Sequence, residues 1–346
     1  NLSVSDYLIA PADIISNNLA VIDVYFPRNR LAELNSFTNI NFVRPLIPSF
    51  TNSGIVTSKG DKAQKSEAAR EAFRVKGAGD ALVKVNGNGI KVGVISDRYD
   101  KQPFTDKTKA TVDVEQGDLP GTGNPDGNTM PVDVLMDYPY GVASDEGRAM
   151  LQIVHDVAPG AELAFHTGVL SPRNFELAIQ SLQAANCDII VDDITFPLEP
   201  FFGTGRISTA IKNFTNEQGN LYFTSAGNFA NDGYQGVFTN STSTPGTNFL
   251  PAGSRAHVYG GTDVLQKISV EPGVYMIVLQ WDEFLASQEN STGAITDLDI
   301  YLVDDNGRRV AAFGYWAGYA RAAISLKCWM AQQRGQIAGP VSRYAG

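Results

Sequence analysis

The chain has 346 residues, of which 43% are hydrophobic and 18% are charged, and its formal net charge is −10. This length and apolar content predict a globular chain of roughly two domains. The acidic balance argues against nucleic acid and anionic membranes as partners, because both require basic patches. No apolar run is long enough to span a bilayer, and the chain, which starts at Asn1 without a secretory leader, is interpreted as a fragment. Cys187 and Cys328 lie in dissimilar stretches and predict neither a disulfide framework nor a metal cluster.

Residues 1–80 are interpreted as a small α+β lead-in, similar to a pro-segment. A strand is predicted over 20–26 and a short helix over 30–37. The stretch 60–73 is charged and rich in alanine, which predicts a solvent-facing helix with little apolar surface to bury. We expect this helix to pack at the edge of the next domain.

Residues 81–231 alternate between strand-like and helical segments. Strands are predicted at 86–97, 132–138, 162–167, 188–196 and 220–228. Apolar side chains recur at helical spacing in 146–157, 174–187 and 206–219. This alternation predicts an α/β fold with a mainly parallel sheet and helices on both faces. In such sheets, chemistry gathers at the carboxyl ends of the strands, and Asp97 lies just past the first of them.

The pattern changes after residue 231. Residues 232–314 contain short alternating segments separated by turn residues, which predict an antiparallel β-sandwich or jelly roll. Asp297, Asp299 and Asp304 are considered as oxygen ligands for calcium, although we favour an ordinary solvent-facing strand side. The tail 315–346 has no acidic residue and receives no structural assignment.

The helix predicted from Glu146 is the segment around which the core is organised. Ser144 is expected to cap its N-terminus, and Pro159 and Gly160 end it. The helix dipole favours a carboxylate at this place. Glu146 is therefore either a simple first-turn acid, which we favour on position alone, or a side chain directed into a site.

Three stretches in this part of the chain resemble the subtilisin-like serine peptidase superfamily of subtilases and sedolisins. They are ISD at 95–97, DEGRAM at 145–150 followed by APGA at 158–161, and TSAGN at 224–228. The resemblance implies a subtilisin-like serine endopeptidase that hydrolyses peptide bonds in a protein or peptide substrate. It also implies no cofactor and a secreted or cell-envelope location. Asp97 matches the catalytic Asp and Asn228 the oxyanion Asn, while Glu146 stands where subtilases carry His.

The catalytic arrangement implied by the resemblance is an acid pair. If the carboxyl groups of Asp97 and Glu146 face each other, they share one proton, and repulsion raises one pKa and lowers the other. Asn228 would donate to the oxyanion. Met150 stands where sedolisins place a second acid, and no G-T-S motif occurs, so the nucleophile is expected outside this fragment, which would be inactive as given.

Other candidate residues and readings stay open. His155 is expected to face the next helical turn or solvent, and His166 and His257 are expected to be structural. One of Asp192 and Asp193 is predicted to lie near Glu146 or near the pocket for the residue before the scissile bond, and a salt bridge at the sheet rim is given equal weight. The alternative function is a catalytically inactive binding or adhesion protein on the same fold, and the oligomeric state is not assigned.

Overall fold

The computed structural model describes residues 14–18, 21–24, 26–36, 43, 59–100, 109–140, 144–197, 199–217, 219–229, 233–241, 255–268, 274–283, 296, 298–303, 324–330 and 336–344. The chain divides into two compact units. The first comprises Asn1–Pro197 and Arg206–Gly227, and the second comprises Leu198–Gly205 and Asn228–Gly346.

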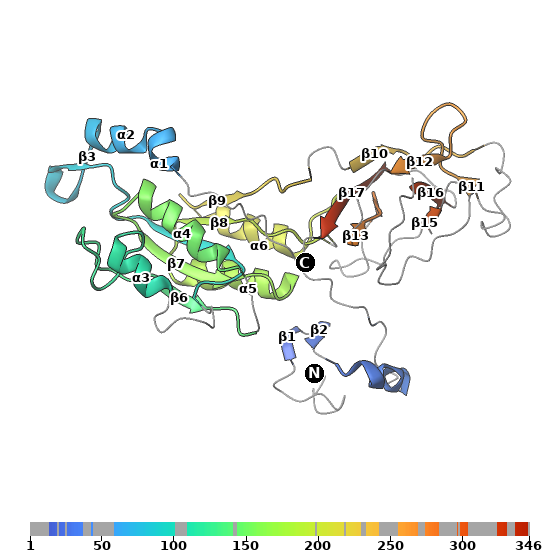
Figure 1. Ribbon diagram of the computed structural model, residues 1–346, viewed down its shortest axis with the longest axis horizontal. Helices are drawn as coiled ribbons and strands as arrows, with labels where there is room; N and C mark the ends of the chain where they lie inside the picture. Colours follow the sequence, from blue (N-terminus) through green and yellow to red (C-terminus); the bar gives the residue numbers. More distant parts are fainter. Residues whose placement is uncertain are drawn as a thin grey trace. The chain divides into compact units, whose positions relative to one another are not determined.

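The first unit is built on a five-stranded parallel sheet (Figure 1). The strand order is β6-β7-β5-β8-β9, and every neighbouring pair is parallel. The strands are β5 (Lys91–Ser96), β6 (Asp133–Met136), β7 (Glu162–Thr167), β8 (Ile189–Asp192) and β9 (Leu221–Thr224). The predicted α/β class with a mainly parallel sheet is confirmed.

Helices cover both faces of this sheet. The helices are α3 (Lys109–Gln116), α4 (Glu146–Val157), α5 (Pro172–Ala184) and α6 (Arg206–Thr215). On one face, α5 and α6 pack with Ile95 in one buried cluster, and on the other, α3 and α4 pack with Val92 and Val94 in a second. The alternation of side chains along β5 thus explains why its whole run is apolar.

One crossover differs in hand from the other three. The chain moves along the sheet in one direction from β5 to β6, and in the opposite direction in its three later steps. The connection through α4 lies on the same face of the sheet as the connection through α3. It nevertheless runs along the sheet in the same direction as the connections through α5 and α6, which lie on the other face. The β6–α4–β7 connection is therefore of opposite hand, which is uncommon, because about 98% of such connections are right-handed. This path lays α4 over β5 and β7.

The lead-in is a set of short elements rather than the one strand and two helices that the sequence predicts. They are β1 (Ile14–Asn18), β2 (Val21–Val24), the 3-10 helices η3 (Arg28–Ser36) and η4 (Ala78–Asp80), α1 (Gly60–Ala63), α2 (Ser66–Ala72), β3 (Arg74–Lys76) and β4 (Leu82–Lys84). The helix predicted over 60–73 is broken at Lys65, whose φ of 62° lies in the left-handed region. The residue predicted to continue the helix instead separates α1 from α2.

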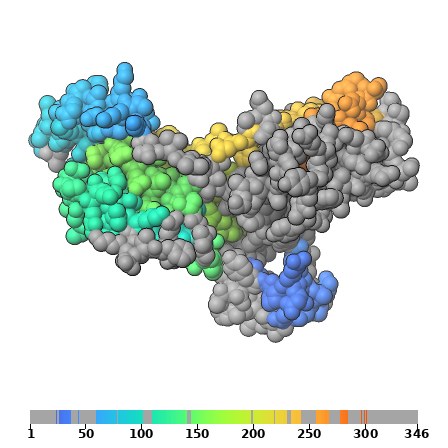
Figure 2. Space-filling model, in the orientation of Figure 1, coloured from blue at the N-terminus to red at the C-terminus, as the bar shows by residue number. Residues whose placement is uncertain are grey.

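Arg70 joins this lead-in to the core of the first unit. Its guanidinium donates to Asp61 at 2.6 Å and 2.9 Å, and to the carbonyl of Val157 at 2.7 Å. Val157 is the last residue of α4, so Arg70 satisfies one of the carbonyl groups that a helix leaves unpaired at its C-terminus. Helix α1 packs against α4, and Figure 2 shows the blue atoms of this segment against the green atoms of the core.

The second unit contains two antiparallel sheets. One has the order β10-β17-β13 with β14 also paired to β17, and the other has the order β11-β16-β12 with β15 also paired to β16. The strands are β10 (Gly233–Val237), β11 (Arg255–Ala256), β12 (Leu265–Ile268), β13 (Val274–Ile277), β14 (Gln280–Trp281), β15 (Leu298–Val303), β16 (Ile324–Met330) and β17 (Gln336–Tyr344). The tail that received no assignment thus supplies the strand with the most partners in each sheet.

His257 has a structural position in this unit, as expected. Its Nδ1 accepts from the backbone N–H of Thr239 at 3.1 Å, and its Nε2 lies 2.9 Å from the hydroxyl of Tyr234. The rings of Tyr234, Phe238 and Tyr259 surround it. Burial lowers the pKa of His257, so the ring is held neutral.

In the part of the chain that the structure describes, no helix has both the length and the apolar character needed to cross a membrane.

We expect Arg70→Ala to lower the free energy of unfolding of the first unit by about 2 kcal/mol, because two partly buried acceptors lose a charged donor. Chemical denaturation followed by circular dichroism measures the change. Lys76→Ala is the matched control, since the Lys76–Asp80 pair is 73% and 84% exposed and surface pairs contribute little. Equal effects of the two substitutions would show that Arg70 does not hold α4.

Candidate functional site

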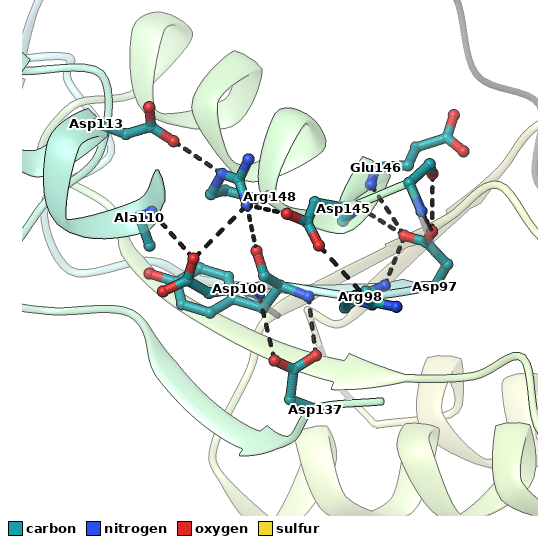
Figure 3. A network of polar contacts seen from close by, with 12 residues as sticks. Asp97, Arg98, Asp100, Ala110, Asp113, Asp137, Asp145, Glu146 and Arg148 are labelled. Carbon is teal, nitrogen blue, oxygen red and sulfur yellow. Dashed lines mark hydrogen bonds and ion pairs between the residues drawn. The ribbon is translucent and has the colours of Figure 1, made fainter. Parts of the chain in front are cut away.

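Asp97 lies at the carboxyl end of β5 and is only 5% exposed. Its Oδ2 accepts from the backbone N–H of Ser144 at 2.8 Å and from the Ser144 hydroxyl at 2.7 Å. Its Oδ1 accepts from the N–H groups of Glu146 at 2.9 Å and Gly147 at 3.3 Å, and also from that of Arg98 (Figure 3). Both oxygens of this carboxylate are therefore engaged by donors.

Asp97 caps helix α4 from another element. The first N–H groups of a helix have no partner within it, and they favour a negative charge. The sequence predicts Ser144 as the capping residue, and this is wrong. The residue that precedes α4 is Asp145, which has a left-handed φ of 57° and makes no side-chain cap. Ser144 is turned toward Asp97 instead, because the β5 carboxylate already occupies the cap position.

Gly147 permits the close approach that this cap needs. A Cβ atom at position 147 would lie 2.8 Å from the carbonyl oxygen of Arg98 and would overlap the ring of Phe165. The N-terminus of α4 thus rests directly on the ends of β5 and β7. From β7, the hydroxyl of Thr167 donates to the carbonyl of Asp97 at 2.6 Å, which fixes the backbone at the same point.

Arg148 organises a second group of buried charges beside the cap. Its Nε donates to Asp113 at 2.8 Å, and its Nη1 donates to Asp145 at 2.7 Å and to the carbonyl of Tyr99 at 2.7 Å. Burial raises the pKa of Asp113, and the adjacent guanidinium opposes that rise. The network joins α3, α4 and the segment after β5, and no pattern in the sequence predicted it.

Two further residues complete this network. Arg98 is fully buried, with its Nε 3.8 Å from Asp145 and its guanidinium 5.6 Å from the centre of the Tyr138 ring. Asp137 accepts from the N–H groups of Tyr99 at 2.9 Å and Asp100 at 3.2 Å. The sequence signal for this network was the group of acidic residues between 97 and 145 together with two arginines. The spacing of these residues does not indicate which acid pairs with which arginine.

Glu146 is directed away from Asp97. Its backbone N–H donates to Asp97, while Figure 3 shows its side chain pointing out of that network. The Glu146 carboxyl lies close enough to that of Asp193 for the two groups to interact. Burial raises the pKa of Asp193, hydrogen bonds with Glu146 and Ser96 oppose this, and the charge of Asp97 adds to the rise. The structure therefore places Asp193 beside Glu146, one of the placements that the sequence left open.

Asp192 points to the other side of β8. Its Oδ1 accepts from the N–H of Ile194 at 3.1 Å and from the hydroxyl of Thr224 at 3.1 Å. Burial raises the pKa of Asp192 to about 6. Since adjacent strand residues face opposite sides, Asp192 ties β8 to β9 and Asp193 is the one that faces Glu146.

The placement of Asn228 beside Asp97 and Glu146 stays a prediction, and the other candidate residues of the first unit lie outside this group. Asn228 is exposed. It is the first residue of the second unit after β9, whereas Asp97 and Glu146 belong to the first unit. Met150 packs, partly buried, against the α3/α4 cluster. His155 does not face solvent, because it is 3% exposed, and burial lowers its pKa. His166 is buried with its Nδ1 2.7 Å from the carbonyl of Thr167, as expected for a structural histidine.

The calcium hypothesis falls largely outside the described residues. Asp297 and Asp304 are not among them, and Asp299 lies in β15. Within the described ranges, no group of three or more His, Cys, Asp or Glu residues is placed to hold a metal ion.

Comparisons with known proteins find similarity over a short stretch. No family model matches the chain. The saccharopine dehydrogenase [NAD(+), L-lysine-forming] of Candida glabrata is 49% identical over 53 residues, which is 15% of this chain and 14% of that protein. The protein of the same name from Schizosaccharomyces pombe is 52% identical over 52 residues, with the same two shares. The chain therefore spans about one seventh of the length of these relatives.

These matches correct the subtilisin-like assignment. The curated relatives are dehydrogenases, whereas the motifs predicted a serine endopeptidase, which is a hydrolase. The expectation of no cofactor is corrected as well, because the name of the relatives includes NAD+. The site gives a physical reason for abandoning the acid pair: the Asp97 oxygens accept from backbone and hydroxyl donors, so they do not hold the Glu146 side chain. The inactive-subtilase alternative loses its basis too, and the secreted location stays an untested prediction.

We expect Asp97→Asn to lower the free energy of unfolding by roughly 2–4 kcal/mol, because an amide NH2 would face donors and the buried charge at the helix N-terminus is lost. Denaturant titration measures the loss. Asp126→Asn makes the same chemical change at an exposed residue and serves as the control. If Asp97→Asn unfolds at the same denaturant concentration as the wild type, Asp97 does not cap α4.

Proposed function

We propose that the first unit binds a small ligand through a terminal ammonium group, and that the Glu146–Asp193 pair accepts this group and exchanges a proton with it. The single observation that carries the proposal is the proximity of two carboxyl groups, that of Glu146 at the start of α4 and that of Asp193 just after β8. Two carboxyl groups in such contact retain one proton between them. The pair then has a net charge close to −1, which suits a monovalent cation.

The surroundings support a cation more than an anion at this position. Asp97 adds a negative charge near Asp193. The nearby guanidinium of Arg148 is engaged by Asp113 and Asp145. A ligand ammonium group would replace the shared proton and allow both carboxyl groups to ionise. Binding therefore releases a proton.

The place in the fold also supports a binding role. The chain leaves β5 toward α3 on one face of the sheet, and leaves β8 toward α6 on the other face. Ligands of open α/β sheets bind where neighbouring strands send their connections to opposite faces. Glu146, at the start of α4, and Asp193, just after β8, lie at that point. The lysine in the name of the relatives is a molecule with a terminal ammonium group, which makes it the natural probe.

We expect L-lysine to bind and L-norleucine, which lacks the terminal ammonium, to bind at least tenfold more weakly. Isothermal titration calorimetry in two buffers of different ionisation enthalpy measures both the affinity and the released proton. Since the pKa of Asp193 is raised, lowering the pH toward it protonates the pair further and weakens binding.

The Glu146→Gln variant is expected to lose at least tenfold in affinity for L-lysine, about 1.4 kcal/mol, together with the proton release. Glu115→Gln removes one carboxylate from an exposed position of α3 and should bind like the wild type. Equal binding of lysine and norleucine, or equal loss in both variants, would contradict the proposal.

A second candidate is an NAD-dependent oxidoreductase, supported by the identity to the saccharopine dehydrogenases over about 50 residues. The described carboxyl end of the sheet does not fit a dinucleotide. Asp97 already occupies the N–H groups of α4 that would bind a pyrophosphate, and Asp97-Arg98-Tyr99 follows β5 instead of a glycine-rich turn. We therefore assign no residue of this edge to the cofactor.

This second candidate predicts that NADH forms when the chain is mixed with saccharopine and NAD+. Absorbance of NADH measures the reaction, and omission of saccharopine is the control. A chain that binds lysine but forms no NADH would retain the first proposal and remove the second.

For the second unit, we propose that its two antiparallel sheets pack as a β-sandwich with a structural role. The antiparallel pairing throughout and the buried aromatic cluster around His257 support this interpretation.

A further inference from the structure

Strand β9 forms one edge of the parallel sheet and pairs with β8 alone among the described strands. Tyr222 points to the α6 side, where it packs against the ring of Phe214. Leu221 and Phe223 point to the opposite face and are 50% and 56% exposed. Two large apolar side chains of one edge strand are thus left in contact with solvent.

The hydrogen bonds of β9 show which backbone groups face outward. The N–H of Leu221 donates to Asp188 at 2.9 Å, and that of Ser225 donates to Asp192 at 3.2 Å. Because backbone groups alternate in direction along a strand, the N–H of Phe223 also faces β8. The N–H and C=O groups of Tyr222 and Thr224 therefore face the outer edge of the sheet.

The sequence around this edge contains no charged residue. Residues 218–231 include no Asp, Glu, Lys, Arg or His, and no Pro. Proteins generally protect an edge strand with charges or proline, because an open edge pairs readily with another strand. This edge has neither protection, although the chain as a whole has a net charge of −10.

We propose that β9 is a self-association surface, at which the β9 strands of two copies of this chain pair antiparallel about a two-fold axis. A two-fold contact brings a surface against its own copy, so a charged edge would repel itself. In this acidic protein, the uncharged stretch 218–231 is where two copies can meet without that repulsion. The partner is therefore a second copy rather than a charged macromolecule.

The outward-facing groups set the register of this pairing. Tyr222 exchanges hydrogen bonds with Thr224 of the partner subunit, and Phe223 lies opposite Phe223 of the partner subunit. Aromatic pairs directly across two antiparallel strands are stabilising. The two five-stranded sheets become one continuous sheet of ten strands, and Leu221 and Phe223 of both copies lie together on one face.

Sedimentation equilibrium over a range of protein concentrations tests this surface. We expect the wild-type chain to dimerise, and Phe223→Lys to weaken the dimer at least tenfold. Leu82→Lys, at a 69% exposed residue of β4, makes a similar change elsewhere and should leave the dimer intact. Added salt should strengthen dimerisation, because it screens repulsion between two acidic chains.

Hydrogen exchange locates the contact independently of the substitutions. The amides of Tyr222 and Thr224 should become protected as the wild-type concentration rises, and should stay unprotected in Phe223→Lys. A chain that is monomeric throughout, a dimer equally weakened by Leu82→Lys, or a dimer without protection of these two amides would overturn the proposal. Lysine binding at Glu146 does not depend on any of these outcomes.

Discussion

The carboxylate of Asp97 is the contact on which the first unit depends. It lies at the end of the central strand and accepts from the first N–H groups of α4, about fifty residues further along the chain. A helix N-terminus that rests on a sheet without such an acceptor would leave buried donors unsatisfied. The cap thus fixes the distance of the α4 N-terminus from the sheet and the orientation of α4 about its own axis. Arg148 and Glu146, which follow in the first turn, are oriented by the same contact.

The rotation of α4 separates two kinds of carboxyl group. Asp113 and Asp145 receive the guanidinium of Arg148, and they are paired with a cation. The carboxyl groups of Glu146 and Asp193 instead interact with each other. A buried carboxyl without a cation keeps its proton more tightly, so the distribution of the arginines decides where a proton is held. The protonation of the Glu146–Asp193 pair therefore depends on arginines that do not touch it.

Periodicity and chemistry in the sequence differ in what they predict. The alternation of apolar runs and amphipathic segments identified the five strands of the sheet, because burial on both faces requires such runs. The place of Asp97 after β5 followed directly. The partner of Glu146 did not follow, since Asp193 lies 47 residues away and only the parallel pairing of β5 with β8 brings the two together. Ser144 has good capping chemistry, yet a distant carboxylate took its role.

The family motifs misled for a related reason. An acid after a strand, a small residue at a helix start and a polar turn after a strand are features that any parallel sheet places near its carboxyl end. Their order agreed with one family, while the matched relatives are dehydrogenases. The composition of the tail was equally uninformative, because strand pairing in β16 and β17 depends on backbone groups that every residue has.

Because of Gly147, the capping of α4 by Asp97 should be recognisable in a sequence. A single methyl group at that position would collide with Phe165 and with the carbonyl of Arg98, and would lift the helix off its anion. The aspartate and the glycine can therefore change only together, although fifty positions separate them. In an alignment of proteins with this fold, the aspartate and the glycine should occur together. A sequence with only one of them should pack its helix against the sheet in a different position.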